Sequence, residues 1–198
     1  MPTIATVGKS HSIEKLSNKL RQLLVGFGFQ EIIRPVLANH KNLFDKMNIK
    51  RENVIELVNP VSEEYVCLRN WLLPSLMEVL SANKHVEYPQ NIFEVGDVVV
   101  PDTNEETMSK TIRKVAVVLA HSKATYSEIK GIVESLLKQM SVNYSFKETS
   151  SRTFIEGRQV EVISNNKSIG FIGEISPVVL EQWELEMPCA AFEIRFEL

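Results

Sequence analysis

Apolar side chains recur every three or four residues between Ser12 and Phe27, and polar residues separate them. This spacing places the apolar positions in one stripe along a helix. Glu14 lies in the first turn, where a carboxylate favours the amino end of a helix dipole. Gly26 and Gly28 supply backbone conformations that end a helix. The pattern therefore predicts a helix here, with a stripe that consists of Ile13, Leu16, Leu20, Leu23, Leu24 and Phe27.

The next segment, FQEIIRPVLAN at 29–39, is rich in residues that favour a strand. Pro35 has no amide hydrogen for a ladder hydrogen bond, so we expect this strand at a sheet edge or bulged at the proline. An exposed strand edge beside an amphipathic helix invites a partner. A short helix is expected around 42–47, and a strand at 54–58 that Asn59-Pro60 ends.

The remaining two thirds of the chain alternate between helical and strand patterns. Helices are expected at 72–84, 125–140 and 177–183, and strands at 90–100, 113–121, 158–164, 168–175 and 189–198. An acidic loop at 101–110 separates the first two of these strands. Strands joined by hairpins, with helices that do not alternate strictly, predict an α+β domain in which helices cover an antiparallel sheet.

Composition favours one ordinary globular domain that spans residues 1–198. Of the 198 residues, 44% are hydrophobic and 24% are charged, which is enough to bury a sizeable core. The net charge of -3 gives no whole-molecule basic field that would attract nucleic acid. No apolar run approaches the roughly 20 residues of a spanning helix, and the amino end has no signal-peptide pattern. We therefore expect a cytoplasmic protein without a membrane partner.

Metal and redox chemistry find little support in the sequence. Cys67 and Cys189 are far apart and lack a CxxC pattern, so we expect buried free thiols. The four histidines lack the spacing of a metal-binding helix and are interpreted as surface or capping residues. No zinc or other metal site is predicted. The histidines are His11, His40, His85 and His121.

Two arginines stand among apolar or turn residues. Arg69 lies in CLRNWLLP and Arg158 in FIEGRQ. Either guanidinium could bind an anion or join loops by bonding carbonyl and carboxylate groups. We favour the structural role, because neither has a second cation nearby in sequence to form an anion clamp.

Several ordered blocks resemble a known family. They are NPVSEEYVCLRNWLLPSLMEVLSANKH, PQNIFEVGDVV, AHSKATYSEIKGIVESLL and the long carboxyl-terminal block that begins FIEGRQ. Together they resemble the catalytic-like module of the phenylalanyl-tRNA synthetase beta subunit of the archaeal and eukaryotic kind, over nearly the whole chain. The resemblance implies a class II aminoacyl-tRNA synthetase-like fold, an antiparallel sheet flanked by helices. It also implies that the chain is a fragment of a longer subunit.

Within this resemblance, the first helix and the proline-containing strand look like class II motif 1, which builds a subunit interface. Whether each residue faces a partner or this domain's own core stays open at this point, because a six-membered stripe on one helix is more often core. The interface residues that the resemblance implies are Leu16, Leu20, Leu23, Leu24, Phe27, Phe29 and Pro35.

The same resemblance implies that this domain does not form an aminoacyl-adenylate. Active relatives hold the ATP phosphates with an arginine in motif 2 and another in motif 3. In the motif 2-like strand of this chain, Asp97, Val98 and Val99 stand near the position of that arginine. An aspartate there would repel a phosphate. The motif 3-like end, AAFEIRFEL, lacks the glycine-rich approach, and Glu193 is expected to pair with Arg195 two residues on. No catalytic residue is predicted.

The resemblance implies a docking role on the catalytic alpha subunit, within an α2β2 enzyme that uses ATP and magnesium and binds tRNA. No cofactor is expected in this domain, and the isolated domain is expected to self-associate through an uncovered apolar stripe. Two alternatives stay open. One is a free-standing adenylating enzyme that recruits Arg69 or Arg158, and the other is a stand-alone paralogue that binds tRNA or an amino acid for regulation.

Overall fold

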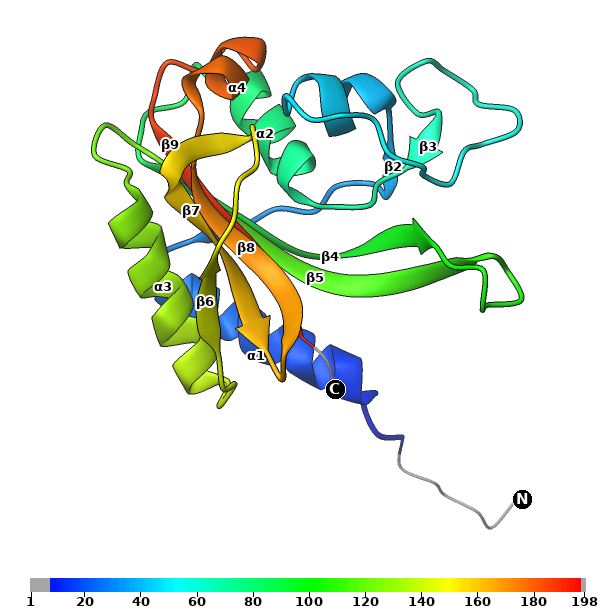
Figure 1. Cartoon of the computed structure of the whole chain (residues 1–198), viewed down its shortest axis with the longest axis horizontal. Coiled ribbons are helices and arrows are strands. Elements are labelled where there is room, and N and C mark those ends of the chain that lie inside the picture. Colours follow the sequence, from blue (N-terminus) through cyan, green and yellow to red (C-terminus); the bar gives the residue numbers. More distant parts are fainter. Residues whose placement is uncertain (1–7, 197–198) are drawn as a thin grey trace, which may run out of the picture.

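A seven-stranded sheet in the order β1-β4-β5-β9-β8-β7-β6 forms the centre of the computed structural model, which describes residues 8–196 (Figure 1). Every neighbouring pair is antiparallel except β1 and β4, which run parallel. The strands are β1 (Gln30–Glu31), β4 (Gln90–Pro101), β5 (Ser109–Ala120), β6 (Ser145–Glu148), β7 (Phe154–Ser164), β8 (Lys167–Ile175) and β9 (Cys189–Arg195). This architecture confirms the expected α+β class.

Helices cover both faces of the sheet. They are α1 (Ser12–Gly26), the short π-helix η1 (Lys41–Asp45), α2 (Leu73–Ala82), α3 (Tyr126–Gln139) and α4 (Pro177–Gln182). The first core lies under α1 and α3, and the second lies under α2 and α4. Strand β5 contributes alternate residues to both cores, so its apolar run is continuous. All five helices lie where the hydrophobic pattern predicts them.

Local residue chemistry sets several helix starts. Thr125 accepts a hydrogen bond from the Glu128 amide at the start of α3, and Ser176 accepts one from Val179 at the start of α4. Pro74 lies in the first turn of α2, where no amide hydrogen is needed. His11 caps α1 through its Nδ1 atom, as expected for a capping histidine.

The segment at 29–39 differs from the expected single strand. It forms two short pieces, β1 at the sheet edge and β2 (Leu37–Ala38), which pairs with β3 (Cys67–Leu68) in a separate two-stranded sheet. Pro35 lies between the pieces and belongs to neither. The expectation of an edge strand is confirmed, but the proline separates two strands because it cannot join a continuous ladder.

The strand predicted at 54–58 was wrong. Only Glu56 forms an isolated bridge, to Cys67, and Val58 lies 93% exposed. Val54 is buried in a small core with Leu43 and Phe44, away from the main sheet, so the apolar pattern reflects that core and not a sheet face. Conversely, β6 was missed because its sole apolar residue is Phe146, and an edge strand with mostly exposed side chains leaves little periodic signal.

Both cysteines are buried free thiols, as predicted. Burial raises the pKa of the Cys67 thiol to about 11 and the pKa of the Cys189 thiol to about 12, because a thiolate is poorly solvated in the interior. Both groups therefore stay protonated and unreactive at neutral pH in the folded chain.

The raised thiol pKa values predict a loss of stability at alkaline pH. Above about pH 9 the unfolded chain releases thiol protons that the native chain retains, so the free energy of unfolding should fall by up to about 1.4 kcal/mol per pH unit for each thiol. Urea unfolding at pH 8 and pH 10 measures this loss. Cys189→Ala should lose less stability over that interval than the unmodified chain, and equal losses would contradict the assignment.

Candidate subunit interface

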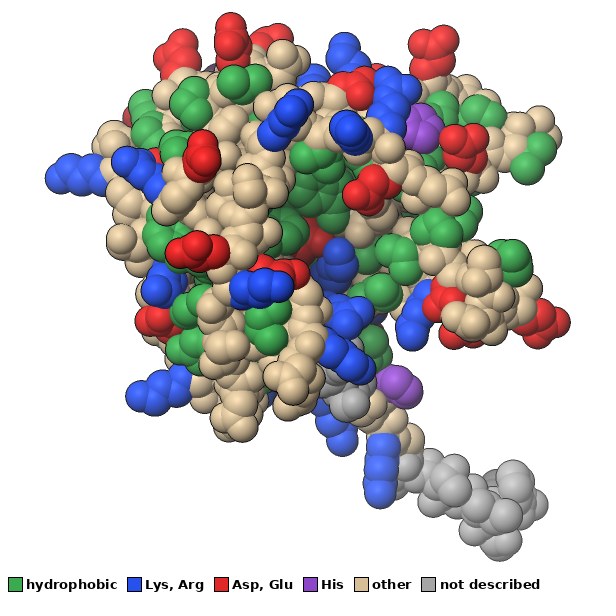
Figure 2. Space-filling model, in the orientation of Figure 1, with side chains coloured by type: hydrophobic (Ala, Val, Ile, Leu, Met, Phe, Trp, Pro, Cys, Tyr) green, Lys and Arg blue, Asp and Glu red, His purple; other side chains and the backbone are tan. Residues whose placement is uncertain are grey.

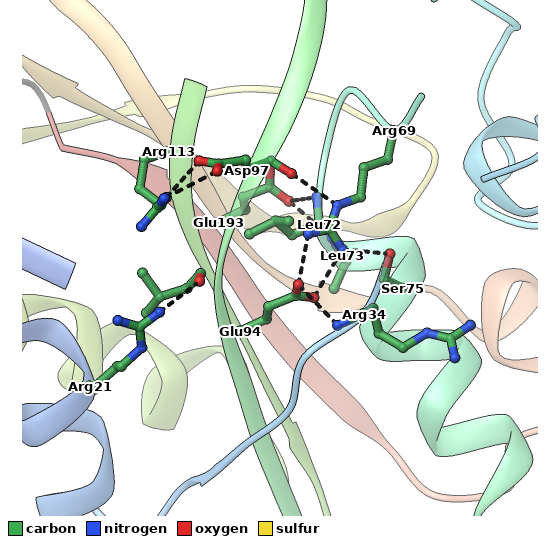
Figure 3. Close-up of polar contacts among 11 residues, drawn as sticks. Arg21, Arg34, Arg69, Leu72, Leu73, Ser75, Glu94, Asp97, Arg113 and Glu193 are labelled. Atoms are coloured by element: carbon green, nitrogen blue, oxygen red, sulfur yellow. Dashed lines mark hydrogen bonds and ion pairs between the residues drawn. The ribbon is translucent and has the colours of Figure 1, made fainter. Parts of the chain in front are cut away.

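A buried ion pair joins the loop before α2 to the sheet. The Arg69 guanidinium donates to both carboxylate oxygens of Glu94 on β4, at 2.7 and 3.1 Å, and the two side chains are 1% and 3% exposed (Figure 3). Arg69 also donates to the carbonyl oxygen of Asp97 at 3.0 Å and to the Ser75 hydroxyl at 3.3 Å. The Arg69 guanidinium is thus engaged by carboxylate, carbonyl and hydroxyl oxygens of the chain itself.

Gly96 makes the close approach of this pair possible. A Cβ atom at this position would lie 2.7 Å from Nη2 of Arg69 and 2.8 Å from Oε1 of Glu94. Either atom would have to shift, which would break the paired geometry of the guanidinium and carboxylate. The sequence FEVG at 93–96 therefore supplies both the carboxylate, from Glu94, and the room for the Arg69 guanidinium, at Gly96.

A second buried carboxylate, that of Glu193 on β9, receives the start of α2. It accepts hydrogen bonds from the backbone amides of Leu72 and Leu73 at 2.8 and 3.0 Å (Figure 3). It also pairs with Nζ of Lys114 at 2.8 Å. A carboxylate at a helix amino end satisfies free amides and suits the helix dipole. The sequence predicted a Glu193–Arg195 pair. In the structure, the contacts of the Glu193 carboxylate are with Lys114 and the first amides of α2.

Asp97 also has an internal partner. It accepts two hydrogen bonds from Arg113 on β5, at 2.6 and 3.1 Å, and these bonds raise the pKa of the Arg113 guanidinium above its ordinary value. Arg113 in turn donates to the Ser17 hydroxyl of α1 at 2.9 Å. The aspartate expected to repel phosphate thus anchors the first helix to the sheet.

Arg158, the other candidate arginine, is half-exposed on β7. Its Nη1 donates to Glu174 at 2.6 Å, and the same carboxylate accepts from the Tyr126 amide at the start of α3. This arrangement joins β7, β8 and α3. Arg158 on β7 lies several strands away from Arg69 and its partner Glu94 on β4. The structure therefore does not bring the two arginines together into an anion site.

The motif 1-like residues divide into a buried group and a surface group. Leu20, Leu24 and Phe29 lie in the core between α1, α3 and the sheet, so they have no surface for a partner. Pro35 is exposed. The partly buried residues at the margin of that core keep some surface; they are Leu16, Leu23 and Phe27.

Sequence reasoning missed two exposed apolar residues in this region. Ile33 is 86% exposed two residues after β1, and Val25 is 58% exposed near the end of α1. β1 ends the strand order, so its outer edge pairs with no other described strand. Pro35 also lines a polar cavity of about 510 Å³ with Arg34 and Leu37. We call the exposed residues Ile33 and Pro35, which follow β1 in the chain, the edge patch.

Neither a metal site nor a membrane span is found in residues 8–196. No group of three or more histidine, cysteine, aspartate or glutamate side chains there is arranged to hold a metal ion. Within the same range, no helix has the length and apolar character needed to cross a bilayer.

Replacing Arg69 with Met should destabilise the chain by about 3–5 kcal/mol, because the substitution leaves the Glu94 carboxylate buried without a partner. Urea unfolding measures the effect. The double variant Arg69→Met with Glu94→Gln should recover part of the loss, since it removes the uncompensated charge. Arg51→Met is the control, because its ion pair with Asp45 is exposed and should matter little. Equal effects of Arg69→Met and Arg51→Met would contradict this account.

Comparison with known proteins identifies a family to which this chain is similar. The family model described as the phenylalanyl tRNA synthetase beta chain CLM domain matches residues 1–196. The phenylalanine–tRNA ligase beta subunit of Thermococcus sibiricus is 47% identical over 193 residues, which cover 98% of this chain and 34% of the relative. The corresponding subunit of Methanocaldococcus jannaschii is 42% identical over 196 residues, with 99% and 36% covered.

The chain thus spans about a third of the length of the curated relatives it matches. The beta subunit of Pyrococcus abyssi gives the same proportion, with 46% identity over 98% of this chain and 35% of the relative. The family match covers nearly every residue and agrees with the α+β sheet and its flanking helices. This chain therefore belongs to the family of phenylalanyl-tRNA synthetase beta chain CLM domains.

Proposed function

We propose that this chain is a noncatalytic domain of a phenylalanine–tRNA ligase beta subunit, and that it docks on the catalytic alpha subunit to support an α2β2 enzyme. In this proposal ATP, magnesium and tRNA bind the assembled enzyme. The open edge of β1 beside the exposed Ile33 carries the docking proposal. The internally paired carboxylates on β4 and β9 support the noncatalytic assignment.

The charge arrangement opposes ATP binding on the sheet face that carries α2. Glu94 and Glu193 are buried carboxylates there, and each already has a cationic partner inside the chain. A phosphate would have to displace Glu94 from Arg69 and then lie close to a free carboxylate. Both steps are unfavourable in a poorly solvated site. The arginine that a free-standing adenylating enzyme would recruit is therefore already engaged.

The edge patch has the features of a surface that another subunit covers. Fully burying an exposed aliphatic side chain such as that of Ile33 stabilises an association by about 1.5–3 kcal/mol. The free edge of β1 offers backbone groups for pairing, and Pro35 limits how far such pairing extends. Leu16, Leu23 and Phe27 remain proposed interface residues at the margin of the helix stripe. Leu20 and Leu24 support the interface indirectly, because they hold α1 in place from the core side.

Placing a charge on the edge patch should weaken docking. Ile33→Asp would bury a carboxylate at the interface and should raise the Kd for the alpha subunit by about thirtyfold, which corresponds to a loss of roughly 2 kcal/mol. Isothermal titration calorimetry with a matching catalytic alpha subunit measures this change.

Val178→Asp serves as the matched control, because Val178 is 50% exposed on α4 and lies outside the edge patch. Circular dichroism should show that both variants keep their fold. Equal weakening by both substitutions would refute the edge patch as the docking site. A well-folded chain that binds no alpha subunit would refute the docking role and favour a stand-alone protein that binds tRNA or an amino acid.

ATP with magnesium should leave the melting temperature of this chain unchanged. A ligand at a hundred times its Kd would stabilise the fold by about 2.7 kcal/mol, a readily detected shift. Differential scanning calorimetry across a range of ATP concentrations measures the response. A saturable rise in melting temperature would overturn the noncatalytic assignment. That result would not contradict the docking proposal, which the titration with the alpha subunit tests separately.

A further inference from the structure

A cavity of about 230 Å³ opens on the sheet face beside the loop between β6 and β7. Aromatic rings of Trp71, Phe154 and Phe171 form much of its wall. The ring centroids of Trp71 and Phe171 are 6.1 Å apart, and those of Phe154 and Phe171 are 5.4 Å apart. Figure 2 shows this face hollowed, with hydrophobic side chains at the bottom of the recess.

Hydrogen bonds hold the walls of this cavity in place. The Trp71 indole nitrogen donates to the Leu43 carbonyl at 3.2 Å. The buried Gln159 side chain accepts from the Ser151 amide at 2.7 Å and donates to the Ser151 carbonyl at 3.2 Å. The Thr153 hydroxyl donates to the Met47 carbonyl at 2.9 Å. The cavity is therefore largely preformed, which reduces the entropy lost when a ligand binds.

Glu161 on β7 is the only charged residue among the described residues that line this cavity. Its sheet register places it directly beside Phe171 of β8, on the same face. No hydrogen bond or ion pair within residues 8–196 engages the Glu161 carboxylate, which is half-buried. Glu193, on the other side of Phe171, is already bound by Lys114 and the start of α2. Of these two acids, Glu161 alone keeps its oxygens available.

Lys147 is the charged neighbour of Glu161 on the solvent side. It lies opposite Glu161 in the register of β6 and β7, and its side chain is exposed. No ion pair joins the two among the described contacts. Lys147 therefore moderates the negative potential at the cavity mouth without neutralising the carboxylate through contact.

We propose that this cavity binds a small organic ammonium ion, with its apolar body against the aromatic rings and its charged nitrogen against Glu161. Aromatic faces attract cations, and a carboxylate forms strong charge-assisted hydrogen bonds with an ammonium group. A cavity of about 150 Å³ can hold benzene, so the volume here suits a single ring with a short side chain. An anion of the same shape would be repelled by Glu161.

The test compares benzylamine with benzyl alcohol, two probes of nearly the same shape, of which only the amine is charged. At pH 7 benzylamine is a cation and should bind this chain with a Kd on the order of 1 mM by calorimetry, as expected for so small a ligand. Benzyl alcohol should bind about tenfold more weakly. Glu161→Gln should weaken benzylamine binding by about tenfold and leave benzyl alcohol binding unchanged. Glu156→Gln, an exposed acid on the same strand, should change neither.

Two further variants separate the charge from the aromatic wall. Lys147→Gln should strengthen benzylamine binding by a few fold, because it removes a like charge near the mouth. Phe171→Leu should weaken both probes, with its fold checked by circular dichroism. Equal affinity for the two probes, or an unchanged benzylamine Kd in Glu161→Gln, would overturn the proposal. So would the absence of benzylamine binding at concentrations tenfold above the expected Kd.

Discussion

The buried pairing of Arg69 with Glu94 is the constraint on which the rest of the α2 face depends. Neither charge can be left alone in the interior, so the loop before α2 must meet β4 at one position. That position fixes Gly96 beneath the pair, and Glu193 then receives the first amides of α2. The loop, the helix and two strands are thus joined by contacts that fail together if one is removed.

The same charges support the proposal that this domain is noncatalytic. A phosphate site needs cations whose partners are absent until the ligand arrives. On the α2 face Arg69 is paired with Glu94 and Lys114 with Glu193, and on the α1 face Arg113 is paired with Asp97. The electrostatic energy of these groups stabilises the resting domain.

Sequence patterns predicted the elements that bury a continuous apolar stripe or a regular hairpin, such as α1, α3 and β4 with β5. They failed where tertiary contacts decide the outcome. Pro35 separated two strands, and β6 exists because β7 offers an edge. The division of the α1 stripe into buried Leu20 and Leu24 and partly exposed Leu16 depends on how the sheet lies beneath it. Likewise, the residues around Arg69 do not reveal whether its partner is a phosphate or Glu94, because the glutamate lies 25 residues away in the chain.

The parallel pairing of β1 with β4 has a consequence for the order of folding. β1 follows α1 directly, yet its register partner Ile92 lies about sixty residues later in the chain. Such a distant contact loses more chain entropy than the local β4–β5 hairpin, so we expect the hairpin to form first. The amino-terminal segment then adds to a finished edge. If this domain docks through β1 as proposed, a nascent or damaged chain without that hairpin would have no β1 to present, and assembly would select completed domains.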